Sequence, residues 1–128
     1  MPSQTEPTRT YLRRAWRLRV PNDEEAFVEF DLVGEPHWRL DLVEVSEVGV
    51  GFRLEGGRPS LAVGTPIAGV MIHAAGLRIA GSIRVAHVTP KPADDTICGA
   101  VFVPSTETDM QAMGRLMSHL EKHNLQSS

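Results

Sequence analysis

Most of the chain after residue 25 divides into short strand-like segments, and two of them alternate between hydrophobic and polar positions, a pattern typical of strands with one buried face. From Ala26 to Val33, apolar residues at positions 26, 28, 30 and 32 flank acidic residues at 29 and 31. From Trp38 to Val45, apolar positions 38, 40 and 42 flank a basic and an acidic residue. Glycine- and proline-containing turns separate such segments. The strands predicted in this way are Ala26–Val33, Trp38–Val45, Val48–Leu54, Thr65–His73, Leu77–Val88 and Ile97–Val103.

The C-terminal segment has a helical period instead. Apolar residues at positions 110, 113, 116, 117 and 120 follow the spacing of one helix face. Ser105, Thr106 or Thr108 can cap the N-terminus, and two acidic residues suit the first turn electrostatically. We therefore predict a helix from about Thr108 to about His123.

Strands followed by a helix, without βαβ alternation, predict a mainly all-β fold with an antiparallel sheet. In a chain of 128 residues there is room for one domain. Closing the sheet removes its exposed edges, so we predict a six-stranded antiparallel β-barrel with a C-terminal α-helix over one opening. The predicted division is a flexible tail over 1–10, a single domain over 11–124 (arginine segment 11–21, barrel 26–103, then the helix) and a tail over 125–128.

Composition narrows the classes of function. The sequence is 41% hydrophobic and 23% charged, which is ordinary for a chain that buries a core. It has no run of about 18 apolar residues, and its first ten residues lack the apolar core of a signal peptide. We therefore expect a cytoplasmic protein without membrane insertion.

Charge is distributed unevenly along the chain. Residues 1–20 hold five arginines and one acid, a net charge of +4, whereas residues 21–128 hold eight basic and fifteen acidic residues, a net charge of −7. An acidic body with one dense basic segment is not typical of a protein that binds duplex nucleic acid. The early basic residues are all arginines, whose forked donors suit phosphates and base edges.

No sequence pattern typical of an enzyme is present. Cys98 lies inside a predicted strand and is interpreted as a small buried apolar residue. The acidic pairs Glu24–Glu25 and Asp94–Asp95 are interpreted as solvated charge. His119 and His123 are four apart on the predicted helix, but two ligands make a weak metal site, so we favour a solvated helix face. We expect no metal and no cofactor.

Two polar segments remain as candidate binding sites. Arg13 and Arg17 are four residues apart, with Arg14 beside them, and can direct paired hydrogen bonds to phosphate oxygens or to a guanine edge. The alternative is a solvated basic segment. The second segment holds Glu44 and Ser46, which point to the same side of an extended strand. A glycine three residues later allows close backbone approach, and the alternative is an ordinary strand–turn–strand.

In this order the two segments resemble the signatures of the PilZ-domain family. The family has RxxxR just before its first strand, matched by Arg13 and Arg17, and (D/N)xSxxG between its second and third strands, matched by Ser46 and Gly49. Glu44 departs from this pattern, because it stands where the family has Asp or Asn.

Other landmarks of the family agree with the two motifs. They are Val20–Pro21 after the arginines, Gly64 before a strand and the Gly99…Phe102 pattern of the last strand. The resemblance covers about residues 11–124.

The resemblance implies a small six-stranded barrel that binds the bacterial second messenger cyclic di-GMP. The residues it implies for the ligand are Arg13, Arg14, Arg17, Glu44, Ser46 and Gly49. We therefore expect a stand-alone receptor, not an enzyme, that takes part in motility or biofilm signalling. Ligand binding would order the arginine segment against the barrel and so relay the signal to an unidentified downstream protein.

Two other functions stay open. A divergent PilZ-like module that binds no nucleotide would regulate motility or pilus machinery through protein contacts; Glu44 favours it and the arginines oppose it. The discriminating feature is whether Arg13, Arg17 and Ser46 converge on one groove free of internal ion pairs. An RNA- or DNA-binding barrel needs aromatics on one sheet face, and with seven aromatics, several at predicted core positions, we rank it last. The sequence leaves monomer and dimer equally open.

Overall fold

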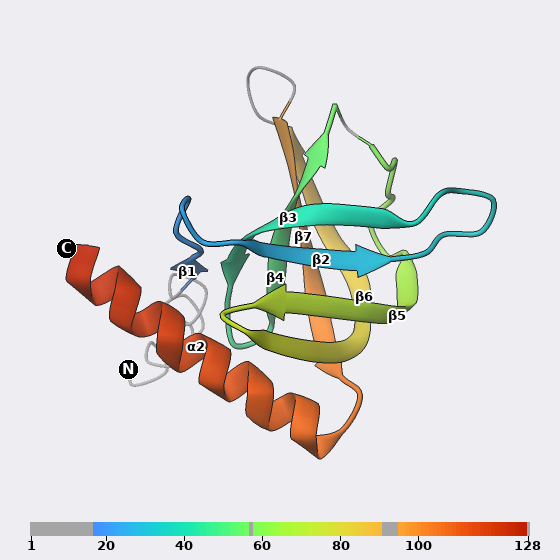
Figure 1. Cartoon of the computed structure of the whole chain (residues 1–128). Helices are drawn as coiled ribbons and strands as arrows, with labels where there is room; N and C mark the ends of the chain where they lie inside the picture. Colours follow the sequence, from blue (N-terminus) through green and yellow to red (C-terminus); the bar gives the residue numbers. More distant parts are fainter. Residues whose placement is uncertain (1–16, 57, 91–94, 128) are drawn as a thin grey trace, which may run out of the picture.

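Strands make up most of the regular secondary structure in the computed structural model, and one long helix follows them (Figure 1). The structure describes residues 17–56, 58–90 and 95–127. The elements are β1 (Leu18–Arg19), β2 (Ala26–Phe30), β3 (Trp38–Val45), β4 (Gly49–Glu55), β5 (Pro66–Ala74), β6 (Leu77–Pro90), β7 (Asp95–Pro104) and α2 (Glu107–Ser127).

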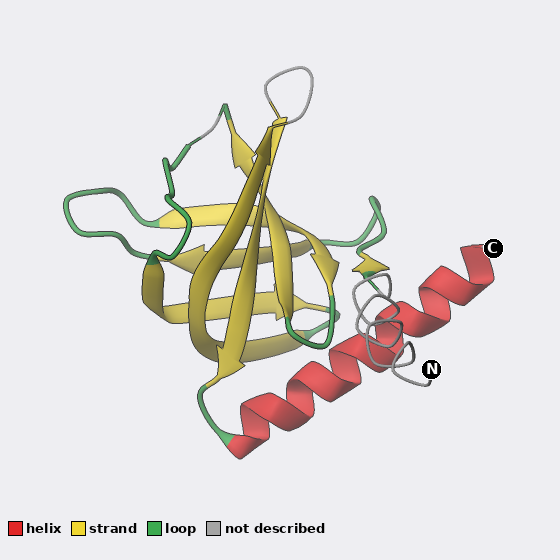
Figure 2. Cartoon of the chain, turned by 180° about the vertical axis from the view of Figure 1, so that it is seen from behind, coloured by secondary structure: helices red, strands yellow, loops and turns green. Residues whose placement is uncertain are grey.

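Six of the strands close into an antiparallel barrel. The order around the ring is β3–β2–β5–β6–β7–β4, and a pairing between β3 and β4 completes it. The short strand β1 pairs with the last two residues of β3, beyond the part of β3 that pairs with β2: Leu18 is opposite Val45 and Arg19 is opposite Glu44. Figure 2 shows the ring from the opposite side. The predicted class, an antiparallel barrel with a C-terminal helix, is confirmed.

Alternate residues of the strands fill the barrel. In β2 the buried side chains are Ala26, Val28 and Phe30, as the alternation predicts. Phe30 meets Phe52 of β4 edge to face, with ring centroids 6.0 Å apart. A large apolar side chain that is fully buried contributes about 1.5–3 kcal/mol. The interior is thus a packed core, and a ligand has to bind on the outside of the barrel.

The helix α2 crosses one end of the barrel, as both views show. Its buried side chains, Ala112, Leu116 and Leu120, recur every four residues and join the barrel core. Met110, predicted to lie on the same face, is 60% exposed. The reason is that the buried face of α2 is centred on positions 112, 116 and 120, and at 3.6 residues per turn Met110 lies about 120° around the helix from that centre.

A capping network holds the start of α2 against the barrel. The backbone N–H of Asp109 donates to Thr106 Oγ1 (3.1 Å), and that hydroxyl donates to Asp109 Oδ2 (2.7 Å). The other carboxylate oxygen, Oδ1, accepts the backbone N–H of Ala80 in β6 (3.0 Å). Of the three candidate caps, Thr106 is therefore the residue used.

Some boundaries differ from the predicted ones. The helix begins at Glu107 and continues to Ser127, so residues 125–127 are helical instead of forming a tail. Strand β2 ends at Phe30, because the chain then turns through Gly34 at a φ of 76° and leaves Val33 exposed. Strand β1 was not predicted, since two residues carry no periodicity. Among the described residues, no helix combines the length and the apolarity needed to cross a bilayer.

The surroundings of Gly49 and Gly114 predict that substitution by alanine has opposite effects on stability at the two positions. In Gly49→Ala the new Cβ would collide with the backbone carbonyl of Ala100 in β7, so we expect a loss of about 1–3 kcal/mol in the free energy of unfolding. In Gly114→Ala the Cβ meets no atom within 4 Å, and a helical alanine should add about 0.5–1 kcal/mol. Urea denaturation measures both values, and effects of the same sign would contradict the described packing.

The cap predicts a pH-dependent contribution from Asp109. Hydrogen bonds from the Ala80 backbone N–H and the Thr106 hydroxyl lower the pKa of Asp109. A carboxyl whose pKa is lower in the folded state stabilises the fold above its ordinary pKa, and this contribution disappears as the pH falls through the folded-state pKa. Asp109→Asn should therefore lower the melting temperature at pH 7, and its gap from the wild type should narrow below about pH 4. A gap that is constant from pH 7 to pH 3 would contradict this.

Candidate functional site

A cavity of about 330 Å³ lies on the outside of the barrel, where the β3–β4 turn meets β6 and β7. Its walls are mainly apolar, and its polar side chains come from Arg17, Glu44, Ser46 and His87. Small-molecule sites are typically concave, mostly apolar and about 300–1,000 Å³ in volume, with a few polar groups that fix orientation. The cavity therefore suits a small molecule that combines apolar surface with a few polar groups.

The cavity brings together four of the six predicted site residues. Arg17, Glu44, Ser46 and Gly49 all line it. The other two, Arg13 and Arg14, lie outside the described residues. The two sequence segments that we selected separately thus contribute to one site.

Strand β1 places Arg17 at the cavity. Its residues pair with the last two of β3, and the backbone N–H of Val20 donates to the Val43 carbonyl (2.9 Å). On the other side, the backbone N–H of Arg19 donates to Asn124 Oδ1 (3.2 Å), and Asn124 Nδ2 donates to the Arg19 carbonyl (3.1 Å). The segment that follows Arg17 is therefore held between the barrel and α2.

An ion pair joins the two polar segments. Arg17 Nη1 lies 3.3 Å from Glu44 Oε2, with the arginine side chain 48% exposed and the glutamate 23% exposed. A pair this accessible to water contributes about 0–1 kcal/mol, so a ligand can displace it at small cost. A guanidinium also carries five N–H donors, which leaves Arg17 able to meet a second acceptor while it contacts Glu44.

Ser46 organises the β3–β4 turn. Its hydroxyl oxygen accepts the backbone N–H groups of Val48 (3.3 Å) and Gly49 (3.2 Å), and its own backbone N–H donates to the Gly49 carbonyl (2.9 Å). Because the oxygen already accepts two donors, Ser46 acts in this structure as a positioning residue. Gly49 has no positive φ, and glycine is needed there because the Ala100 carbonyl lies against it.

His87 is a cavity residue to which sequence analysis gave no role. It stands on β6 opposite Gly99 of β7, and its imidazole ring fills the space that a side chain at position 99 would need. Thr89 Oγ1 lies 3.4 Å from its Nδ1. The sequence carried a partial signal, since Gly99 is a landmark of the last strand, but linking it to His87 requires the register of β6 and β7.

The buried cysteine offers no reactive thiolate. Cys98 is fully buried in β7, as predicted, and burial raises the pKa of its thiol to about 11. At neutral pH the thiol is therefore protonated and serves as a core residue.

Comparison with known proteins identifies related folds. No protein-family model and no curated protein matches the chain. Solved structures do match: the K. pneumonia MrkH–c-di-GMP complex has a TM-score of 0.76 at 13% identity, over 88% of this chain and 53% of that one. The PilZ domain with c-di-GMP of YcgR from Escherichia coli has a TM-score of 0.71 at 16% identity, over 88% and 93%.

A third match comes from another bacterium. The Bacillus subtilis inhibitor of motility, MotI/DgrA, has a TM-score of 0.61 at 14% identity, over 87% of this chain and 51% of that one. This chain thus spans about half the length of MrkH and of MotI/DgrA. Because the identities are low, the structural similarity shows the fold alone. That fold is the one that the two sequence motifs indicated. The protein has a PilZ-like fold.

Proposed function

We propose that this protein is a receptor for cyclic di-GMP and that the ligand binds at the cavity beside the β3–β4 turn. The observation that carries the proposal is the meeting of Arg17 with Glu44 and Ser46 in one cavity, from segments 27 residues apart. Two of the similar structures, MrkH and the YcgR PilZ domain, are described as complexes with c-di-GMP. That description concerns those proteins and supports the same ligand class here.

The chemistry of the cavity fits the two parts of this ligand. Cyclic di-GMP carries two phosphates and two guanines. Arg17 would donate to a phosphate or to guanine O6 and N7, and Arg13 and Arg14 of the same segment would add further donors. Glu44 would accept from guanine N1 and N2, while the apolar wall packs against the base. The imidazole of His87 offers a flat surface and a ring nitrogen beside the same wall.

Binding would exchange one ion pair for several contacts. The ligand phosphate replaces Glu44 as a partner of Arg17, which frees the carboxylate to meet the guanine edge. Because both members of the pair are partly exposed, little desolvation opposes the exchange. The acidic body of the chain would disfavour long nucleic acids, which carry many phosphates.

The signal would pass through the arginine segment. Fixing Arg13 and Arg14 on the ligand anchors the chain ahead of β1, and β1 in turn contacts α2 through Arg19 and Asn124. The ligand would thereby change the surface presented by the segment and the end of α2, where a partner protein can bind. No bond is made or broken, so the function is that of a receptor and not of an enzyme.

One observation favours a second candidate function. Arg17 is engaged by Glu44, and Glu44 departs from the Asp or Asn of the family. A module that uses this pair structurally would bind no nucleotide and would act through protein contacts. MotI/DgrA is described as an inhibitor of motility, which is compatible with either candidate.

Calorimetric titration of cyclic di-GMP separates the two functions. The wild type should bind, and Arg17→Ala should weaken binding by roughly 10- to 100-fold, because a charge-assisted hydrogen bond contributes about 1.5–3 kcal/mol. Arg13→Ala should have a similar effect. Arg39→Ala is the matched control, since Arg39 is exposed on β3, contacts Phe27 and Glu25, and does not line the cavity.

Two outcomes would reject the receptor. Absence of binding by the folded wild type at high micromolar ligand would leave the protein-contact module as the function. An equal loss in Arg39→Ala and Arg17→Ala would show that the ligand responds to overall charge and does not occupy the cavity.

Substitutions at Glu44 and Ser46 should separate ligand contact from positioning. Glu44→Gln removes an exposed ion pair, so we expect stability to change by less than about 1 kcal/mol while nucleotide affinity falls at least about tenfold. Ser46→Ala removes two acceptor contacts in the turn and should cost about 1 kcal/mol or more of stability. Urea denaturation and calorimetry on the same samples give both values. Tighter binding by Glu44→Gln would show instead that Glu44 competes with the ligand for Arg17.

A further inference from the structure

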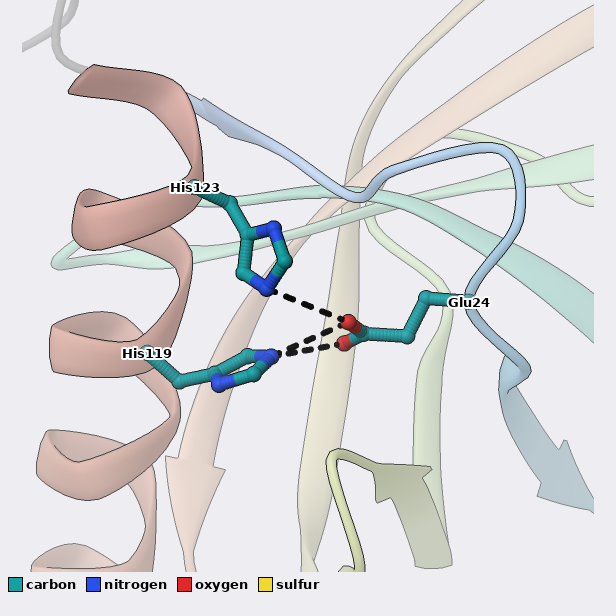
Figure 3. A group of neighbouring side chains, drawn as sticks. All are labelled: Glu24, His119 and His123. Carbon is teal, nitrogen blue, oxygen red and sulfur yellow. Dashed lines mark hydrogen bonds and ion pairs between the residues drawn. The ribbon is translucent and has the colours of Figure 1, made fainter. Parts of the chain in front are cut away.

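A second cluster of polar side chains lies where α2 meets the segment between β1 and β2 (Figure 3). His119 and His123, one helical turn apart, point toward Glu24, which reaches across from that segment. His119 Nε2 is 3.1 and 3.0 Å from the two carboxylate oxygens of Glu24, and His123 Nε2 is 3.8 Å from Oε2. The fold brings together Glu24 and His119, which are 95 residues apart in the sequence.

The spacing of the three donor groups suits one metal ion. One ligand atom from each residue lies within 4.8 Å of the other two. In a tetrahedral zinc site with ligands at about 2.0–2.1 Å, any two ligand atoms are about 3.3 Å apart. The distances from Glu24 to the two histidines, 3.0 and 3.8 Å, bracket that value, so small side-chain rotations would bring all three donors onto one ion.

The local structure holds the donors in place. The two histidines are fixed by their i, i+4 spacing on one face of α2, with ring centroids 4.6 Å apart. Glu24 belongs to a turn in which its backbone N–H donates to the Pro21 carbonyl (3.1 Å). Next to the cluster, Asn124 joins α2 to β1. The cluster therefore loses little conformational freedom when it binds an ion.

Accessibility at the cluster also suits a metal. The side chains of His119 and His123 are 37% and 41% exposed, and that of Glu24 is 19% exposed. Water can therefore reach the donors and complete the coordination shell, as it does where a protein supplies three ligands. Two imidazoles and a carboxylate are ligands that Zn²⁺ and related transition metals accept, whereas Ca²⁺ and Mg²⁺ prefer oxygen.

Another histidine–carboxylate cluster, around Glu29, lacks the convergent geometry of the Glu24 cluster. Glu29 contacts His37 through Oε1 (2.7 Å) and His73 through Oε2, while His37 Nδ1 lies 2.9 Å from Asp31. Here each carboxylate oxygen of Glu29 contacts a different imidazole, and the donors come from β2, from β5 and from the loop after β2. Among the described residues, the Glu24 cluster is the group whose three donors converge.

We propose that Glu24, His119 and His123 bind one divalent transition-metal ion of the Zn²⁺ type. Nε2 of each histidine and a carboxylate oxygen are the protein ligands, and water fills the remaining position. The ion fastens the C-terminal half of α2 to the segment between β1 and β2. The site shares no residue with the nucleotide cavity, so it stands or falls independently of that function.

The test is titration of the chelator-treated 128-residue chain with ZnCl₂ by calorimetry. We expect one ion per chain and a higher melting temperature in its presence. Co²⁺ should give visible absorption bands that Zn²⁺ abolishes by displacing it. His119→Gln, His123→Gln and Glu24→Gln should each weaken binding by at least the roughly 10- to 100-fold that loss of even an outer-shell partner causes.

His37→Gln is the matched control, because it removes a histidine that also contacts carboxylates but belongs to the other cluster. It should leave zinc affinity within about twofold of the wild type. Circular dichroism without metal verifies that each variant is folded, and Glu24→Gln preserves the side-chain shape if a histidine variant does not fold. Unchanged affinity in Glu24→Gln, an equal loss in His37→Gln, or no binding by the wild type at high micromolar zinc would overturn the site.

Discussion

The pairing of β3 with β4 closes the barrel, and the hydrogen bonds of the turn between them hold that closure at its end. Gly49 allows β4 to pass against the Ala100 carbonyl, so β7 can pair on the other side. The same turn sets Glu44 and Ser46 at the cavity wall. Closure of the fold and the shape of the site therefore depend on one set of contacts. The effects of a substitution there on stability and on binding are separated only when both are measured on the same variant.

Arg17 is held at this site by long-range contacts of the residues that follow it. Strand β1 is only two residues long, so its position depends on its pairing with the end of β3 and on Asn124 of α2. The proposed zinc site would add a second link between α2 and this part of the chain, at Glu24 in the segment that follows β1. The C-terminal helix thus serves as a lid over the core and as the support for the segment that carries Arg17.

Local patterns predicted the elements and part of the site. Period-two alternation located β2 and β3, and the turns between segments located the other four barrel strands. Cys98 was correctly assigned to the core. The patterns did not predict β1, the use of Thr106 as the cap among three candidates, or His87 as a cavity residue, since each depends on register or on a distant partner.

The Glu24 cluster depends on a distant partner in the same way. Glu24 was interpreted as solvated charge, and its contact with His119 and His123 forms only when α2 packs on the barrel.

The central claim is that cyclic di-GMP occupies the cavity beside the β3–β4 turn. The measurement that tests it most directly is an amide NMR titration of the ¹⁵N-labelled protein with the nucleotide. The account predicts saturable shifts concentrated at Arg17, at the Glu44–Gly49 turn, and at His87 and Gly99 of the facing strands. Saturable shifts confined to surfaces away from these residues would contradict it, as would the absence of any shift in the folded protein at high micromolar ligand.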